Sequence, residues 1–281
     1  MDCIIVRYAE IALKGRNRIH FERRLVSNIE DCLKKNSHPF QAVERLRNRI
    51  LVRTEQDCPH LRRVFGIASY SPATQADLTM EAMSQQVLAE ARQLTEKSAF
   101  RISCQRVDKA FKHTSSEIQR SMGALVQQKT RAKVSLTAFD TDIGIELFAG
   151  RAFVFTKRVS CFGGMPLGTE GKAVVVISDK AGIVASLLLM KRGVEVLPVA
   201  AQPMDIGLME RYSYGCQVEL KLLSGWQEIE TYAHEKRTDA IAVSQTLERF
   251  EQIPVGMLLL RPLIGYDSKE IDELYERFRQ A

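Results

Sequence analysis

The sequence predicts an α/β protein in which small α/β units precede a doubly wound parallel-sheet domain. A length of 281 residues is enough for roughly two domains that each bury a core. Short strand and helix patterns alternate through the N-terminal part, as expected for mixed α/β structure. The C-terminal part instead contains continuous apolar runs around a helix, which is typical of strands buried on both faces.

The first 70 residues predict a small α/β unit. Residues 2–8 are a short apolar run and predict a buried strand. Asn17 is expected to cap a helix that runs to about Lys35, because apolar residues recur every four positions within it. Residues 45–54 alternate arginine with aliphatic side chains, which predicts one strand with its arginines largely on one face. Residues 61–65 predict a short helix.

A second α/β unit is predicted next. Helices are expected over 78–96 and 115–128, with a strand over 100–106 between them. Ser115 is expected near the cap of the second helix, with Glu117 following it. Residues 143–156 predict a hairpin that turns at Ala149-Gly150-Arg151.

The pattern then changes. Residues 160–171 contain four glycines and a proline, and we interpret them as a linker. The apolar runs 173–177 and 194–199 flank an apolar helix at 181–192, which together predict a βαβ unit. Ligands of such sheets bind at the carboxyl ends of the strands, which is the 178–183 turn here.

The charge is divided along the chain. Residues 1–168 hold 27 Lys and Arg against 17 Asp and Glu, a net charge of +10, whereas residues 169–281 hold 13 against 17, a net charge of −4. The basic part is expected to hold a polyanion. Because aromatic residues are sparse there, phosphate contact with folded RNA fits better than base stacking on a single strand.

Several classes of protein are excluded. The composition, 45% hydrophobic and 26% charged, is that of a globular protein. The longest apolar runs are too short to span a bilayer, and no secretory signal is seen at the N-terminus. The six cysteines have no regular spacing, which predicts reduced thiols and a cytoplasmic protein. The histidines are dispersed, so no metal site is predicted.

Five motifs, in order, resemble those of the tRNA 4-thiouridine synthetases, or tRNA sulfurtransferases, a family connected with thiamine biosynthesis. They are VRYAEIALKGRNRIHFERRL, QRVDKAFKHTSSEIQRSMGALV, FGGMPLGTEGKAVVVIS, VSQTLE and RPLIGYDSKEI. The resemblance implies an N-terminal ferredoxin-like domain (1–72), a THUMP RNA-binding domain (73–160), a linker (161–171) and a truncated ATP-pyrophosphatase-like (PP-loop) α/β domain (172–281).

The resemblance also implies an activity and partners. Family members bind tRNA, adenylate a uridine at the junction of acceptor stem and D-arm, and replace its oxygen with sulfur from a cysteine persulfide. A homodimer is implied, with the THUMP domain of one chain presenting tRNA to the other. Six basic residues fall where the resemblance expects tRNA contact: Lys14, Arg16, Arg18, Arg106, Lys109 and Lys112.

The phosphate loop departs from the family pattern. Members carry Ser-Gly-Gly-x-Asp-Ser, whose glycines let backbone N–H groups approach a pyrophosphate. Here the run is SDKAGI and only Ser178 matches. We therefore predict a helix capped by Ser178 or Asp179 and no ATP binding. The alternative is an altered loop that binds ATP with Mg²⁺ through Val176, Ile177, Ser178, Lys180, Gly182 and Gln245.

The sulfur chemistry departs too. The acceptor cysteine of the family lies downstream of RPLIG, at a position without a counterpart before Ala281, and the rhodanese domain of some members has no counterpart either. Cys216 is expected to be a bystander thiol. The first hypothesis is thus a tRNA-binding protein whose adenylation chemistry is lost, with no confident catalytic residue. The second is an active ATP-dependent tRNA sulfurtransferase served by a separate sulfur carrier protein. A protein-interaction module, using the acidic C-terminal part, is the third.

Overall fold

The structure is a computed structural model that describes residues 1–46, 48–109, 111–238 and 240–281. Arg47, in the strand predicted over 45–54, Ala110, in the QRVDKAFK motif, and Asp239 lie outside the described residues. The chain divides into two compact units. Unit 1 comprises Met1–Arg7, His38–Cys58 and Ser69–Ser160, and unit 2 comprises Tyr8–Ser37, Pro59–Ala68 and Cys161–Ala281. The domain boundaries expected from the sequence stay predictions.

Unit 1 is built on one mixed sheet, which has nine strands among the described residues, in the order β2-β3-β1-β4-β8-β7-β5-β6, with β9 paired to β4. The long strand β4 joins its two halves, because Ser69–Ala73 pair with β1 and Thr74–Asp77 pair with β8. The strands are β1 (Cys3–Arg7), β2 (Ala42–Leu46), β3 (Arg49–Arg53), β4 (Ser69–Asp77), β5 (Ala99–Arg106), β6 (Lys133–Val134), β7 (Thr141–Phe148), β8 (Arg151–Phe155) and β9 (Val159–Ser160).

The strand predicted over 45–54 is wrong, because the structure forms a β2–β3 hairpin there. Asn48 adopts φ +64°, a left-handed conformation that asparagine tolerates and that tight hairpin turns require. The hairpin puts Arg45 opposite Ile50, and Arg49 on the other face. The arginines therefore do not share one face.

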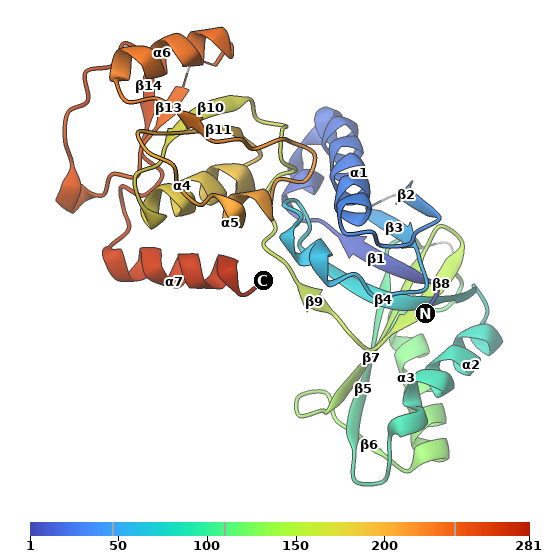
Figure 1. The fold of residues 1–281 in the computed structure, drawn as a ribbon. Helices are drawn as coiled ribbons and strands as arrows, with labels where there is room; N and C mark the ends of the chain where they lie inside the picture. Colours follow the sequence, from blue (N-terminus) through green and yellow to red (C-terminus); the bar gives the residue numbers. More distant parts are fainter. Residues whose placement is uncertain (47, 110, 239) are drawn as a thin grey trace. The chain divides into compact units, whose positions relative to one another are not determined.

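Two helices cover part of this sheet. Helices α2 (Met80–Glu90) and α3 (Ser115–Thr130) pack on β5, β7 and β8 around a buried apolar core that includes Met83, Phe100 and Ile145 (Figure 1). The cap of α3 is Thr114 rather than Ser115. Its side chain accepts a hydrogen bond from the Glu117 N–H, and the Glu117 carboxylate accepts one from the Thr114 N–H, a complete capping box. The 3-10 helix η4 (Ala91–Gln93) continues α2.

A charged cluster lies inside unit 1. Glu146 of β7 is 2% exposed and accepts hydrogen bonds from Arg7 Nε at 2.6 Å and from Arg49 Nε at 2.7 Å. Arg7 also donates to Ser71 and lies over the Phe155 ring. Burial lowers the pKa of Arg7, while the Glu146 carboxylate acts in the opposite direction. This carboxylate thereby ties strands β1, β3 and β7 together.

Unit 2 contains a parallel sheet that has five strands in the described part of the chain, in the order β12-β11-β10-β13-β14. Helices α4, α5 and α7 lie on one face and α6 on the other (Figure 1). The predicted βαβ unit is confirmed, since β10 pairs in parallel with β11 across α4. The elements are β10 (Lys172–Val176), α4 (Lys180–Lys191), β11 (Glu195–Ala200), α5 (Gly207–Glu210), β12 (Lys221–Leu222), α6 (Trp226–Glu235), β13 (Ala240–Ala242), η5 (Leu247–Arg249), β14 (Leu258–Leu260) and α7 (Ser268–Arg279).

Unit 2 also contains helix α1 (Arg18–Lys35) and the 3-10 helices η1 (Glu10–Leu13), η2 (Gly15–Asn17) and η3 (Pro59–Arg63). The helix has the predicted extent, but Asn17 is itself helical and its side chain forms no capping bond. A polar face of α1 contacts the C-terminal part of the chain. Arg24 donates to the carbonyls of Leu167 and Gly215, and the Asp31 carboxylate accepts from the Gly215 N–H.

The expected linker is firmly packed within unit 2. Met165 and Leu167 are 3% and 2% exposed. Gly164 has φ +80°, and a Cβ there would lie 2.1 Å from the Lys191 carbonyl oxygen, so only glycine fits. The segment is thus part of the core of this unit.

Candidate functional site

Three cavities meet at Ser178, immediately after the carboxyl end of β10. The first has a volume of about 440 Å³ and lies between the start of α4, the 244–249 segment and α7. The second, about 430 Å³, lies toward Met204 and Trp226. The third, about 260 Å³, extends to Pro254. Because β10 lies between β11 and β13, the strand order reverses here. This topological switch point is where ligands bind in such sheets, and it is the position predicted from the sequence.

The N-terminus of α4 is closed by its own chain. Asp179 is the N-cap, and its Oδ1 accepts a hydrogen bond from the Gly182 N–H at 3.1 Å. Gly182 itself is buried against β10, because a Cβ there would lie 2.9 Å from Ile177 Cα. This glycine therefore serves close packing between helix and strand. The predicted cap at Asp179 is confirmed.

Lys180 extends from the loop to α7. Its Nζ lies 2.5 Å from Asp272 Oδ1, and both side chains are about half exposed. The hydrogen bond to Asp272 raises the pKa of the lysine, and the charges of Asp272 and Asp179 add to this effect. The ion pair fixes Lys180 across the first cavity.

Gln245 lies three residues beyond the end of β13, and both polar atoms of its side-chain amide form hydrogen bonds. Arg261 Nε donates to Gln245 Oε1 at 2.8 Å, and Gln245 Nε2 donates to the Glu251 carbonyl at 3.1 Å. Of the other residues of the alternative nucleotide site, Val176 lines two cavities and Ile177 is 1% exposed. The structure brings Ser178, Lys180 and Gln245 to one cavity.

The residues at the loop do not fit a pyrophosphate. A phosphate bound at a helix N-terminus needs backbone N–H groups that are not already hydrogen-bonded. It also needs no side chain between these N–H groups and the phosphate. Here the Asp179 carboxylate takes the Gly182 N–H and brings a negative charge to the same place. The cation of the loop, Lys180, is paired with Asp272. Arg249, from the 244–249 segment, also lines this cavity.

Cys216 is half-buried on the α1 side of unit 2. Its Sγ accepts a hydrogen bond from Arg24 Nη2 at 3.2 Å. Burial, followed by the charge of Glu195, raises the pKa of the thiol, and Arg24 opposes this effect. A raised pKa favours the protonated thiol, which is a poor nucleophile; the bystander role of Cys216 stays a prediction.

The first basic motif lies in unit 2, around Gly15. Arg16 is exposed and forms no ion pair with any residue that the structure describes. Lys14 Nζ lies 2.7 Å from Glu170 Oε1. Arg18 is held by two bonds, to Glu22 Oε1 at 2.7 Å and to the Tyr8 hydroxyl at 2.6 Å. Arg16 thus presents its charge to solvent, whereas the other two cations already have acidic or phenolic partners.

The second basic motif lies in unit 1, after β5. Arg106 Nη2 donates to the carbonyls of Lys109 and Phe111 at 2.9 and 2.8 Å, and so fastens the loop. Lys109 and Lys112 are exposed on that loop. Arg106 therefore shapes the loop, and the two lysines present its charge.

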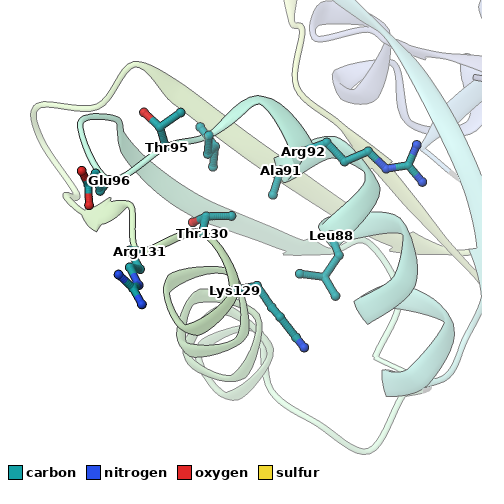
Figure 2. A pocket seen from close by; sticks show the side chains of 9 residues that line it. Leu88, Ala91, Arg92, Thr95, Glu96, Lys129, Thr130 and Arg131 are labelled. Carbon is teal, nitrogen blue, oxygen red and sulfur yellow. The ribbon is translucent and has the colours of Figure 1, made fainter.

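Sequence reasoning missed a basic groove in unit 1. Its volume is about 670 Å³, between the C-terminal ends of α2 and α3 (Figure 2). Leu88, Ala91 and Leu94 contribute apolar lining, and the cationic side chains of Arg92, Lys129 and Arg131 surround it. Arg92 is the only one of these cations outside α3 and its C-cap, so periodicity in one helix did not reveal the cluster.

The described residues contain neither a metal centre nor a membrane-spanning helix. No group of three or more His, Cys, Asp or Glu side chains is arranged to hold a metal ion there. In the same part of the chain, every helix is too short or too polar to cross a membrane.

Comparison with known proteins places these features in context. Residues 3–71 match the ThiI ferredoxin-like domain, and residues 78–157 match the THUMP domain. A probable tRNA sulfurtransferase of Thermococcus kodakarensis is 32% identical, over 98% of this chain and 87% of the relative. Another, of Geobacillus kaustophilus, is 31% identical, over 97% of this chain and 81% of the relative.

Two solved structures share the fold over nearly the whole chain. PH1313 from Pyrococcus horikoshii has a TM-score of 0.90 at 29% identity, covering 99% of this chain and 100% of that one. A 4-thiouridine synthetase–RNA complex with bound ATP has a TM-score of 0.81 at 25% identity, covering 99% and 85%. The T. kodakarensis alignment spans 334 positions against 281 residues here, so at least 53 positions have no residue of this chain.

Proposed function

Because the chain belongs to the tRNA sulfurtransferase family, we propose that it binds tRNA and does not itself adenylate uridine. The basic surfaces of the two units hold the tRNA phosphates. The parallel-sheet domain keeps the family fold but lacks a working phosphate loop. A tRNA-binding protein of this kind acts in the cytoplasm, and the family resemblance supports a homodimer.

The charge distribution supports tRNA as the partner. Arg16, Lys109 and Lys112 are exposed cations on the two predicted motifs, and Lys14 joins them once Glu170 is displaced. Phosphate contacts supply most of the affinity of such surfaces. The structural neighbour in complex with RNA has the same fold over 99% of this chain, which supports RNA binding by this chain as well.

One observation supports the proposal that this chain does not itself adenylate uridine. Asp179 occupies the N–H of Gly182 at the N-terminus of α4, where the anion of a nucleotide would bind. Displacing this carboxylate removes a helix cap and brings its charge against the incoming phosphates. Adenylation is then left to another protein, or does not occur on the tRNA that this chain holds.

The active-enzyme hypothesis has one observation in its favour. The cavities around Ser178 are retained, and two of them are each large enough to accept part of a nucleoside. The structural neighbour binds ATP with a related fold. In that case ATP, with Mg²⁺, would have to displace both Asp179 and the Lys180–Asp272 pair, and a separate carrier protein would supply sulfur.

The test of the RNA-binding half is titration of labelled bulk tRNA, followed by fluorescence anisotropy at about 50 to 200 mM salt. About six phosphate contacts predict a log–log slope on the order of −4 to −5. Arg16→Glu and Lys14→Glu are each expected to weaken binding and to flatten the slope.

Lys236→Glu is the matched control, because it makes the same charge change on the exposed C-cap of α6. It should weaken binding only slightly, through the net charge. Binding that is indifferent to salt, or equal losses in all three variants, would contradict phosphate contact by the Lys14–Arg16 motif.

A further inference from the structure

Two apolar side chains are exposed where α1 begins. Leu13, the last residue of η1, is 87% exposed, the highest value among the large hydrophobic residues described as exposed. Ile19, in the first turn of α1, is 48% exposed. A single exposed leucine is ordinary at a protein surface. Leu13 and Ile19 differ from such a residue because basic residues lie close to both.

Cations lie near both residues in the sequence. Lys14 and Arg16 follow Leu13 within three residues, with Arg16 in the 3-10 helix η2 that leads into α1. Ile19 and Arg23 share one face of α1 because they are four residues apart. Arg16 and Arg23 are exposed. Gly15 between Lys14 and Arg16 has φ +52° and open space around its Cα. We call Leu13, Lys14, Arg16, Ile19 and Arg23 the η1–α1 surface.

The carboxylates near this surface are already engaged. Glu170 pairs with Lys14 at its edge, and Glu22, which is 3% exposed, accepts from Arg18 and Tyr8. The opposite side of α1 is buried through Leu25 and Ile29. The exposed face therefore combines two apolar side chains with a net positive charge.

We propose that Leu13 and Ile19 contact the ribose or base of one RNA nucleotide while Lys14, Arg16 and Arg23 hold the neighbouring phosphates. This inference rests on the tRNA binding proposed above. In a nucleotide chain, charged phosphates alternate with sugars and bases that have apolar faces. Cations can therefore contact the phosphates while neighbouring apolar side chains contact a base or ribose. A second copy is disfavoured as the occupant, because a two-fold contact would bring these cations against their own counterparts.

The two kinds of contact differ in their response to salt. Phosphate contacts release counterions and set the slope of log affinity against log salt. Burial of an apolar side chain releases no counterions. Its loss therefore lowers the affinity by the same factor at every salt concentration and leaves the slope unchanged. Leu13→Ala is expected to weaken tRNA binding about fivefold to tenfold at every salt concentration, from partial burial of its removed methyl groups. Ile19→Ala is expected to have a smaller effect in the same direction.

The experiment compares four variants in the same anisotropy titration. Leu13→Ala and Ile19→Ala test the proposal, and Lys14→Gln is expected to reduce the slope by about one. Leu258→Ala is the matched control, because Leu258 is also exposed, at 62%, but lies on β14 in a sequence stretch, 250–260, that contains no Lys or Arg. Thermal melting should be unchanged for Leu13→Ala, since so exposed a side chain contributes little to the core.

The outcomes separate the proposals. If the parent protein does not bind tRNA, the proposed function fails. If the parent binds in a salt-dependent manner but Leu13→Ala and Leu258→Ala both bind like the parent, this inference alone is wrong. It is equally overturned if Leu13→Ala keeps full affinity but dissociates a parental dimer in sedimentation, because the surface then faces a second copy.

Discussion

Asp179 Oδ1 accepts a hydrogen bond from the Gly182 N–H at 3.1 Å, at the N-terminus of α4. This contact places a carboxylate where nucleotide-binding members of such folds place a phosphate. The cap stabilises the helix, and under the proposed function the same carboxylate closes the site to a phosphate. The cavities beside it are present.

Asp179→Gly should reopen the N-terminus of α4. Glycine is an acceptable N-cap, so the expected loss in the free energy of unfolding is only a few tenths of a kcal/mol. Inorganic tripolyphosphate should then give a measurable heat of binding in calorimetry where the parent gives none. Asp267→Gly is the control, because Asp267 caps α7 through the Glu270 N–H at 2.8 Å and lies outside the phosphate loop. Equal anion binding by both variants would count against the role of Asp179.

Glu170→Gln should strengthen RNA binding. Glu170 neutralises Lys14 across 2.7 Å, and a phosphate must compete with it for the ammonium group. Removing the carboxylate ends this competition, so it is expected to raise affinity several-fold at low salt, with a slope close to that of the parent. Glu273→Gln, which removes an equal charge from the longer Lys269 pair on α7, is the control. A lower affinity of Glu170→Gln would show that the pair holds Lys14 in its binding position.

Glu146→Gln should destabilise the protein strongly. Its carboxylate is the shared partner of Arg7 and Arg49, all three side chains being at least nine-tenths buried. Leaving two buried cations without their carboxylate is expected to cost about 3–5 kcal/mol in urea unfolding. Asp142→Asn removes the partner of the more exposed Arg101 and should cost no more than about 1 kcal/mol. Similar midpoints for both variants would show that the buried cluster contributes little.

Stability should fall in alkali between pH 10 and about 12. Burial raises the pKa of Tyr8, Tyr212 and Tyr214 from 10 to about 12 in the folded protein. The folded state therefore favours the protonated phenols, and this stabilisation is complete below pH 10 and is lost as pH rises through about 12. Ultraviolet titration of tyrosinate should show at least three of the seven tyrosines ionising late. Ionisation of all seven near pH 10 in the native protein would contradict this burial.

The parallel-sheet domain was predictable because its signals are local. The apolar runs at 173–177 and 194–199, with a helix of the right length between them, dictate a βαβ unit. The cap at Asp179 follows equally from local chemistry. The 45–54 segment failed for a local reason as well, because the turn at Asn48 interrupts an arginine alternation that continues on both sides of it.

The partners of the cations were not predictable. Glu170 lies 156 residues from Lys14, and Asp272 lies 92 residues from Lys180, so no sequence window contains either pair. These pairs decide which cations are presented to a ligand. The same applies to the groove of Figure 2, which is lined by Arg92 after α2 and by Lys129 of α3.

The most direct measurement is isothermal calorimetry of the full chain with ATP and Mg²⁺, in the presence and absence of bulk tRNA. A tRNA-binding protein with a closed phosphate loop predicts salt-sensitive binding of tRNA and no heat from ATP in either condition. Micromolar ATP binding by the parent protein, with or without tRNA, would contradict the closure of α4 by Asp179 and restore the active sulfurtransferase as the function of this chain.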